Sequence, residues 1–143
     1  MPKSAHIKKY QFSIEQLKKK YEPFYKKIGT VFCSALKDDV HFGNIGWKHI
    51  RYDSHKHKRL PANIAMRFNL LPYIPEVLKN AKSHFKEEGT LKNGNKILFY
   101  ELAEEVNVDG KTKHVTVIIT EVVGGRKHYF SARYTRLKKK KTP

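Results

Sequence analysis

The segment from residue 44 to residue 59 is the part of the chain best equipped for chemistry, because three histidines, three lysines and two arginines gather there. Histidine is the side chain whose ordinary pKa lets it both donate and accept protons near neutral pH. Cleavage of a phosphodiester needs such proton transfer, and it needs nearby positive charge to hold the phosphate. The segment therefore favours acid–base chemistry on a phosphate group, with His49 as the first candidate.

A basic surface loop is the competing interpretation of the same residues. A chain with a formal net charge of +17 carries many basic side chains by composition alone, and we favour this interpretation for His41, His55 and His57. His49 differs, since apolar residues lie close on both sides of it in a segment of helical character. We expect it to be partly buried, either as a packed core residue or as a working acid or base.

The last predicted strand offers a matching set of polar groups. Alternate residues of a strand share a face, so residues 128–135 divide into two rows. One row is Tyr129, Ser131, Arg133 and Thr135, and the other is His128, Phe130, Ala132 and Tyr134. The second row is mostly apolar and fits a core. In the first row, Ser131 and Arg133 could grip one phosphate together, although an exposed sheet face without function would look the same.

The charge of the chain decides which classes of partner to expect. Thirty Lys and Arg face only 13 Asp and Glu, and such an excess attracts polyanions. Nucleic acid is therefore the first candidate partner, and an acidic protein is another. We expect no membrane partner, because the chain shows neither a membrane-spanning apolar run nor a basic helix with a strong apolar face beyond those that form the core.

Several kinds of metal and redox site are not expected from the sequence. Cys33 is the single cysteine, which excludes an internal disulfide, a zinc ribbon and an iron–sulfur cluster. Glu104 and Glu105 are neighbours on a predicted strand and so point to opposite faces. The acidic residues thus form no paired-carboxylate magnesium site, and we expect chemistry that uses side chains alone, with no metal and no cofactor.

The helices and strands expected along the chain must position these residues. Their order predicts one α+β domain over residues 1–143, with basic N- and C-terminal tails. A capping box at Ser13 predicts the start of the first helix, which Pro23 should kink or end. Further helices are expected over residues 45–52, over residues 62–71 and after Pro72 and Pro75.

The second half of the chain has the alternating pattern of strands. Strands are expected over residues 95–106, 111–123 and 126–137, with an edge strand over residues 85–91. Residues 30–36 fit a short strand or an extended arm, and residues 37–46 read mostly as a connection. The predicted architecture is a set of N-terminal helices packed on a C-terminal antiparallel sheet of about four strands.

This order of elements resembles the Barnase–EndoU–colicin–RelE group of small nucleases, in particular its phage and mobile-element members. Two motifs carry the resemblance, Gly46-Trp47-Lys48-His49-Ile50 in a helix and Lys127-His128-Tyr129-Phe130-Ser131 in the last strand. In that group a helix-borne histidine faces a hydroxyl residue on a late strand. The similarity covers roughly residues 28–137 by order of elements. It departs at Arg133, where many relatives carry an aromatic residue.

The resemblance implies a metal-independent, toxin-like endoribonuclease. The 2′-hydroxyl of RNA would attack the adjacent phosphorus and leave a 2′,3′-cyclic phosphate and a 5′-hydroxyl. The residues expected to carry catalysis are His49, Ser131, Arg133 and Lys48. Those expected to bind RNA or its phosphates are Arg51, Tyr52, His57, Arg59 and Tyr134.

The resemblance also implies partners and a place of action. The substrate would be an RNA, with tRNA, ribosomal RNA and messenger RNA all open, and an acidic immunity protein or antitoxin would neutralise the enzyme. It would act in a cytoplasm, either as a free protein or after secretion or delivery into a target cell. The alternative function is a noncatalytic RNA- or DNA-binding module, which charge alone does not separate from the enzyme.

Overall fold

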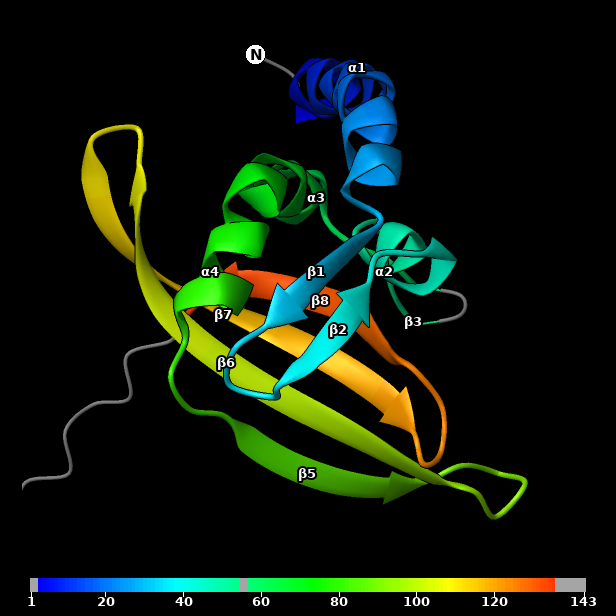
Figure 1. Cartoon of the computed structure of the whole chain (residues 1–143). Helices are drawn as coiled ribbons and strands as arrows, with labels where there is room; N and C mark the ends of the chain where they lie inside the picture. Colours follow the sequence, from blue (N-terminus) through cyan, green and yellow to red (C-terminus); the bar gives the residue numbers. More distant parts are fainter. Residues whose placement is uncertain (1–2, 55–56, 136–143) are drawn as a thin grey trace, which may run out of the picture.

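The computed structural model of this chain describes residues 3–54 and 57–135, with side chains over residues 14–53 and 57–135. It has an α+β fold in which the helices precede the long strands, as expected (Figure 1). The helical elements are α1 (Lys3–Ile28), α2 (Asn44–His49), α3 (Pro61–Leu70), the 3-10 turn η1 (Leu71–Tyr73) and α4 (Ile74–Asn80). The strands are β1 (Thr30–Cys33), β2 (Asp38–His41), β3 (Tyr52–Ser54), β4 (His57–Lys58), β5 (Phe85–Thr90), β6 (Lys96–Val108), β7 (Lys111–Val122) and β8 (Lys127–Tyr134).

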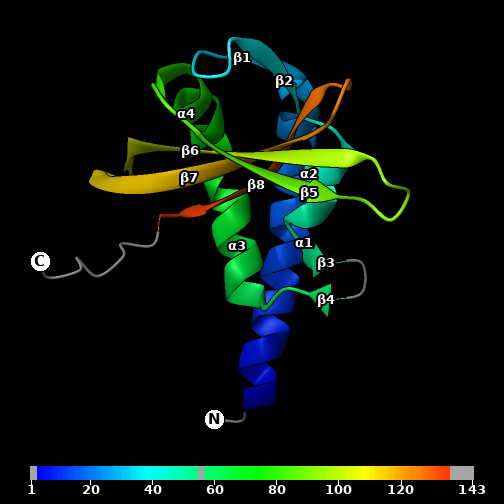
Figure 2. The same cartoon turned by 90° about the horizontal axis from the view of Figure 1, so that it is seen from below.

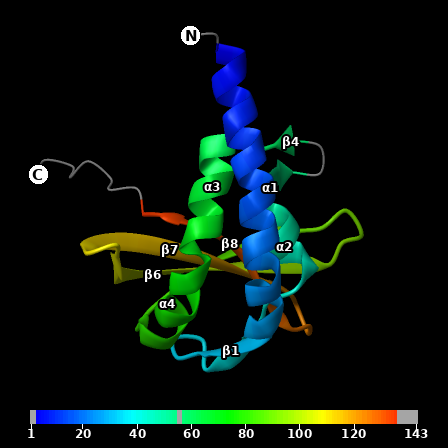
Figure 3. The ribbon, with the colours of Figure 1, turned by 90° about the horizontal axis from the view of Figure 1, so that it is seen from above.

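Prolines mark the starts of α3 and α4, as the sequence predicted, but Pro23 does not end α1. Pro61 stands in the first turn of α3 and Pro75 in the first turn of α4, where the missing N–H costs nothing. The prediction that the first helix starts at Ser13 is wrong, because α1 begins at Lys3 and runs through Pro23 to Ile28. Its later turns lie beside α3 (Figure 3). This tertiary packing explains why the helix continues past the proline.

The main sheet has six strands in the order β1-β2-β8-β7-β6-β5. Strands β5 to β8 form the predicted antiparallel meander, and Asp109 and Gly110 take positive φ in the turn between β6 and β7. Two parts of the prediction are wrong. The expected connection after residue 37 contains β2, which pairs with β1 as a hairpin, and β2 runs parallel to β8. The sheet is therefore mixed and larger than the four strands expected.

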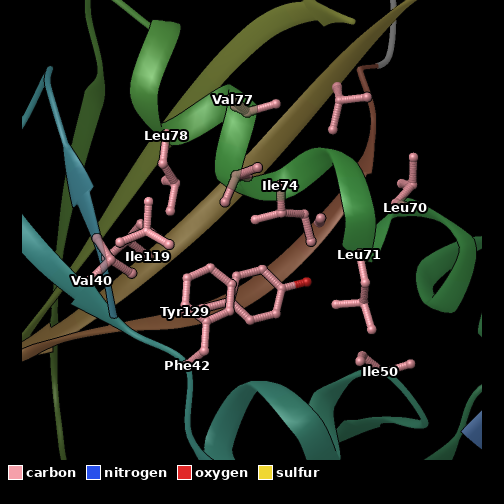
Figure 4. Packing of buried hydrophobic residues seen from close by; sticks show 14 of the residues in the cluster. Val40, Phe42, Ile50, Leu70, Leu71, Ile74, Val77, Leu78, Ile119 and Tyr129 are labelled. Carbon is pink, nitrogen blue, oxygen red and sulfur yellow. The ribbon is translucent and has the colours of Figure 1, made fainter. Parts of the chain in front are cut away.

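One face of this sheet packs against α4 to form the core. Ile74 and Leu78 point from α4 toward Ile119 and Tyr129 of the sheet, and Val77 of the same helix is buried in the same cluster (Figure 4). Seen from below, α4 and β1 lie on one side of β6 and β7, whereas α3, β3 and β4 lie on the other (Figure 2). The sheet therefore has a face packed into the core and a second face bordered by α2 and the small β3–β4 sheet.

A β-bulge in β8 changes which residues share a face. Ile119 pairs with Tyr129 but Ile118 pairs with Ser131, so Phe130 is an extra residue. Tyr129 therefore enters the core and is fully buried, while Ser131 and Arg133 share the opposite face, as predicted. The prediction is wrong for Tyr129, which was placed in the polar row, and for Tyr134, which is 38% exposed rather than part of a core.

Candidate functional site

Helix α2 carries His49 at its C-terminal end and packs closely against β8. Gly46 permits this approach, because a Cβ atom there would lie 2.4 Å from ring carbon Cδ2 of Tyr129 and 2.7 Å from the hydroxyl of Tyr25. Trp47 is buried beside Gly46 and anchors the inner side of the helix. The following two residues, Lys48 and His49, reach the surface, where Lys48 is exposed and His49 is half-buried.

A cavity of about 630 Å³ opens beside His49. Its lining residues are Ile45, Lys48, His49, Arg51, Tyr52, Asp53 and Phe130. Two cations and two aromatic rings thus border the imidazole, and Asp53 is the carboxylate in the lining. The His49 ring stacks on the Phe130 ring with 4.0 Å between centroids. The bulge that places Phe130 outside the core therefore also supports the imidazole.

Arg59 fixes the position and the tautomer of His49, and burial together with nearby charge sets its protonation state. The Arg59 Nε donates to the His49 carbonyl oxygen at 2.9 Å, and its Nη2 lies 2.8 Å from Nε2 of the imidazole. A guanidinium can only donate, so Nε2 accepts and the ring proton is on Nδ1. Burial, then the charges of Arg59 and Arg67, lower the pKa of His49 to about 4, against a weaker effect of Asp53. The imidazole is therefore neutral at pH 7.

Arg67 of α3 forms a second, deeper part of this basic cluster. It is 7% exposed, and it donates from Nη1 to the Ser131 hydroxyl and, at 2.9 Å, to the Ala132 carbonyl oxygen. Its Nε donates to Oδ1 of Asn63 at 2.7 Å. Burial, then the charge of Arg59, lower the pKa of Arg67 to about 10, so the guanidinium stays charged at pH 7. The Ser131 hydroxyl is thus buried and accepts a hydrogen bond from Arg67.

The structure brings some of the predicted site residues together. Lys48, His49, Arg51 and Tyr52 line the same cavity, and Arg59 bonds to His49 behind it. These residues all lie within the basic segment that the sequence singled out.

The other predicted site residues do not line the His49 cavity, which corrects the expected phosphate grip. Arg133 lines a different cavity, where its Nη2 lies 3.5 Å from Oε1 of Glu101. Ser131 is 5% exposed and held by Arg67, and Tyr134 lines a third cavity. His57 is exposed on β4 and is not a lining residue of the His49 cavity, whereas His55 lies outside the described residues.

Arg67 and Phe130 are the site residues that sequence reasoning missed. Arg67 follows Ile64 by three positions and adjoins Phe68 in α3, so it sits on the apolar face of that helix. An arginine at such a position is a readable signal of a buried polar contact. Phe130 was placed in a core row because nothing in the sequence marks the bulge.

Within residues 3–54 and 57–135, no group of three or more His, Cys, Asp or Glu side chains is arranged to hold a metal ion. No helix in the same residues is long and apolar enough to cross a membrane.

Comparisons with known proteins identify a family. No curated protein and no solved structure gives a significant match to the chain. One family model matches residues 13–129, a range that includes α2, Arg59, Arg67 and every lining residue of the His49 cavity except Phe130. The chain therefore belongs to the family described as large polyvalent protein-associated domain 3.

Proposed function

We propose that the His49 cavity is the active site of a metal-independent endoribonuclease. The observation that carries the proposal is a neutral imidazole in a cavity bordered by cations and aromatic rings. An imidazole that is neutral at pH 7 can act as a general base, and such a group contributes about a hundred- to ten-thousand-fold in rate. Lys48, Arg51 and Arg59 supply the positive charge that a phosphodiester and its transition state require.

The proposed reaction starts with an exchange of partners at Arg59. The guanidinium turns Nη2 from His49 to a phosphate oxygen, while its Nε stays on the His49 carbonyl oxygen. Nε2 of His49 then accepts the proton of the ribose 2′-hydroxyl, and the 2′-oxygen bonds to phosphorus. The bond from phosphorus to the 5′-oxygen breaks, and the 5′-oxygen takes a proton from water. The products are a 2′,3′-cyclic phosphate and a 5′-hydroxyl, and the imidazolium gives its proton back to solvent.

Substrate binding also strengthens the base. The negative charge of the phosphate counters the two guanidinium groups that lower the pKa of His49. The pKa of His49 therefore rises in the complex, toward the range in which a general base works best at neutral pH.

RNA is the proposed substrate because this reaction uses the 2′-hydroxyl. The net charge of +17 supports a polyanionic substrate and binding that weakens steeply with salt. The same charge supports an acidic protein as the proposed neutralising partner. The family description supports a role as one domain of a larger polyvalent protein.

A noncatalytic RNA-binding module is the second candidate, and one observation favours it. In this structure Nε2 of His49 accepts a hydrogen bond from Nη2 of Arg59, so the lone pair that a general base would need is already used. If Arg59 does not leave when RNA binds, the imidazole remains a structural partner of the guanidinium.

The deciding experiment incubates the purified chain with RNA in EDTA and analyses the fragment ends. The proposal expects fragments with 2′,3′-cyclic phosphate ends, and a loss of at least about a hundredfold in rate for His49→Gln. His114→Gln, at an exposed histidine of β7, is the matched control and should cleave like the wild type. Tight binding of intact RNA by all three proteins would favour the binding module, and a requirement for Mg²⁺ would overturn the mechanism.

A further inference from the structure

A second cavity adjoins the His49 cavity, and the two share Ile45 and Phe130 as lining residues. The second cavity has a volume of about 250 Å³. Its remaining lining residues come from the sheet and its turns, and they are Ile97, Thr120, Val122, Gly125, Arg126 and His128. A ligand that fills the first cavity could therefore extend over Phe130 into the second.

The floor of the second cavity is the sheet face opposite the core. Ile97 pairs with Val122, and Thr120 pairs with His128, so these side chains lie on neighbouring strands of one face. Phe130 reaches the same face through the bulge, and its ring packs edge-to-face against Phe99 at 5.5 Å between centroids. The lining is mostly apolar, as a site for a flat ring requires.

We propose that this second cavity binds a nucleobase of the RNA whose phosphate occupies the His49 cavity. The inference rests on the proposed function, because it assigns the neighbouring cavity to the same substrate. A volume of about 250 Å³ lies below the roughly 300–1,000 Å³ of sites for drug-sized ligands, so it suits one ring system. Single-stranded RNA is recognised by unstacked bases that lie against such side chains.

Arg126 makes guanine the preferred base. It is exposed at the turn between β7 and β8 and contributes to the rim of the cavity. A guanidinium presents paired donors, which match the O6 and N7 acceptors of guanine. Adenine presents a donor at the position of O6, so it cannot accept both bonds.

Two adjacent valines allow a matched test. Val122 lines the cavity and is 41% exposed, whereas Val123 does not line it and is 55% exposed. Val122→Glu and Val123→Glu add the same charge at neighbouring surface positions, so a general repulsion of RNA affects both. Only Val122→Glu places a carboxylate in the proposed base site. Arg126→Met removes the paired donors and leaves the apolar lining in place.

The probes are guanosine 3′-monophosphate, adenosine 3′-monophosphate and inorganic phosphate, titrated by calorimetry. We expect the wild type to bind the guanosine nucleotide about tenfold more tightly than inorganic phosphate, the effect of one stacked base. Val122→Glu should lose that advantage and still bind inorganic phosphate, while Val123→Glu should behave as the wild type. Arg126→Met should bind the guanosine and adenosine nucleotides equally. Equal effects of the two valine substitutions, or no preference for the guanosine nucleotide, would overturn the inference.

Cleavage of RNA by the same proteins separates this inference from the proposed function. Selective nucleotide binding that Val122→Glu abolishes, without any cleavage of RNA, would leave the base site standing and reject the nuclease. Cleavage without base preference, at the same rate in Val122→Glu and Val123→Glu, would reject the base site and leave the nuclease standing.

Discussion

Replacement of Arg59 should change the protonation of His49 by an amount that the structure bounds. The pKa of His49 is about 4, and its distance from the ordinary value of about 6.5 corresponds to about 3 kcal/mol in favour of the neutral ring. Burial is the largest cause and Arg59 the second. Arg59→Met should therefore recover less than half of this difference and raise the pKa of His49 to about 5.

Nuclear magnetic resonance of the histidine rings measures this directly, with His49→Gln used to assign the His49 signals. Nitrogen shifts at pH 7 should show a neutral His49 ring with its proton on Nδ1, and a titration toward acid should give the pKa. Lys58 is the exposed residue next to Arg59 in the chain and carries the same charge, so Lys58→Met is the matched control. This substitution should leave the pKa of His49 nearly unchanged. A wild-type His49 that titrates near 6.5, or equal shifts in Arg59→Met and Lys58→Met, would refute the reasoning.

Three further predictions concern stability. Gly46→Ala should destabilise the fold by about 1–3 kcal/mol, because its Cβ would overlap Tyr129 and Tyr25; an unchanged denaturant midpoint would contradict this packing. Nζ of Lys127 lies 2.9 Å from Oδ2 of Asp38 and 2.9 Å from Oε1 of Glu121. Burial lowers the pKa of Lys127, but the two carboxylates together outweigh burial and raise it. Lys127→Met should thus cost about 2 kcal/mol, whereas the exposed Lys113→Met should cost almost nothing. The lowered pKa of His49 means that the unfolded chain binds more protons between about pH 6.5 and 4. Stability should therefore fall across that window as the solution is acidified, by well under about 3 kcal/mol after screening by solvent, and His49→Gln should flatten the fall seen in chemical denaturation at each pH.

Local patterns in the sequence were enough to predict much of the fold. Alternation of β-branched and aromatic residues identified the three long strands of the meander, and Asp109-Gly110 marked the turn between β6 and β7. The segment around His49 was expected to be helical and partly buried, and α2 confirms both expectations. Each of these predictions depends on residues close together in the sequence, namely the spacing of apolar residues within one helix or strand or the residue types of one turn.

The parts that failed depend on contacts between distant segments. β2 contains two aspartates and only one buried valine, Val40, so its strand character comes from pairing with β1 and β8. The bulge at Phe130 arises in the pairing with β7, and it moved Tyr129 into the core. Arg133 was expected beside His49 and lies instead near Glu101, because strand alternation alone does not say which helix covers which end of a face.

The pH dependence of RNA cleavage tests the central claim most directly, namely that His49 acts as a base whose pKa is lowered by burial and by Arg59. Because kcat/KM reports the ionisation of the free enzyme, we predict that it falls on the acid side with a midpoint near pH 4. The midpoint should move to about pH 5 in Arg59→Met, and that of kcat should lie higher than that of kcat/KM in the wild type. No cleavage at any pH, or a rate that declines as the pH rises above 4, would contradict the account.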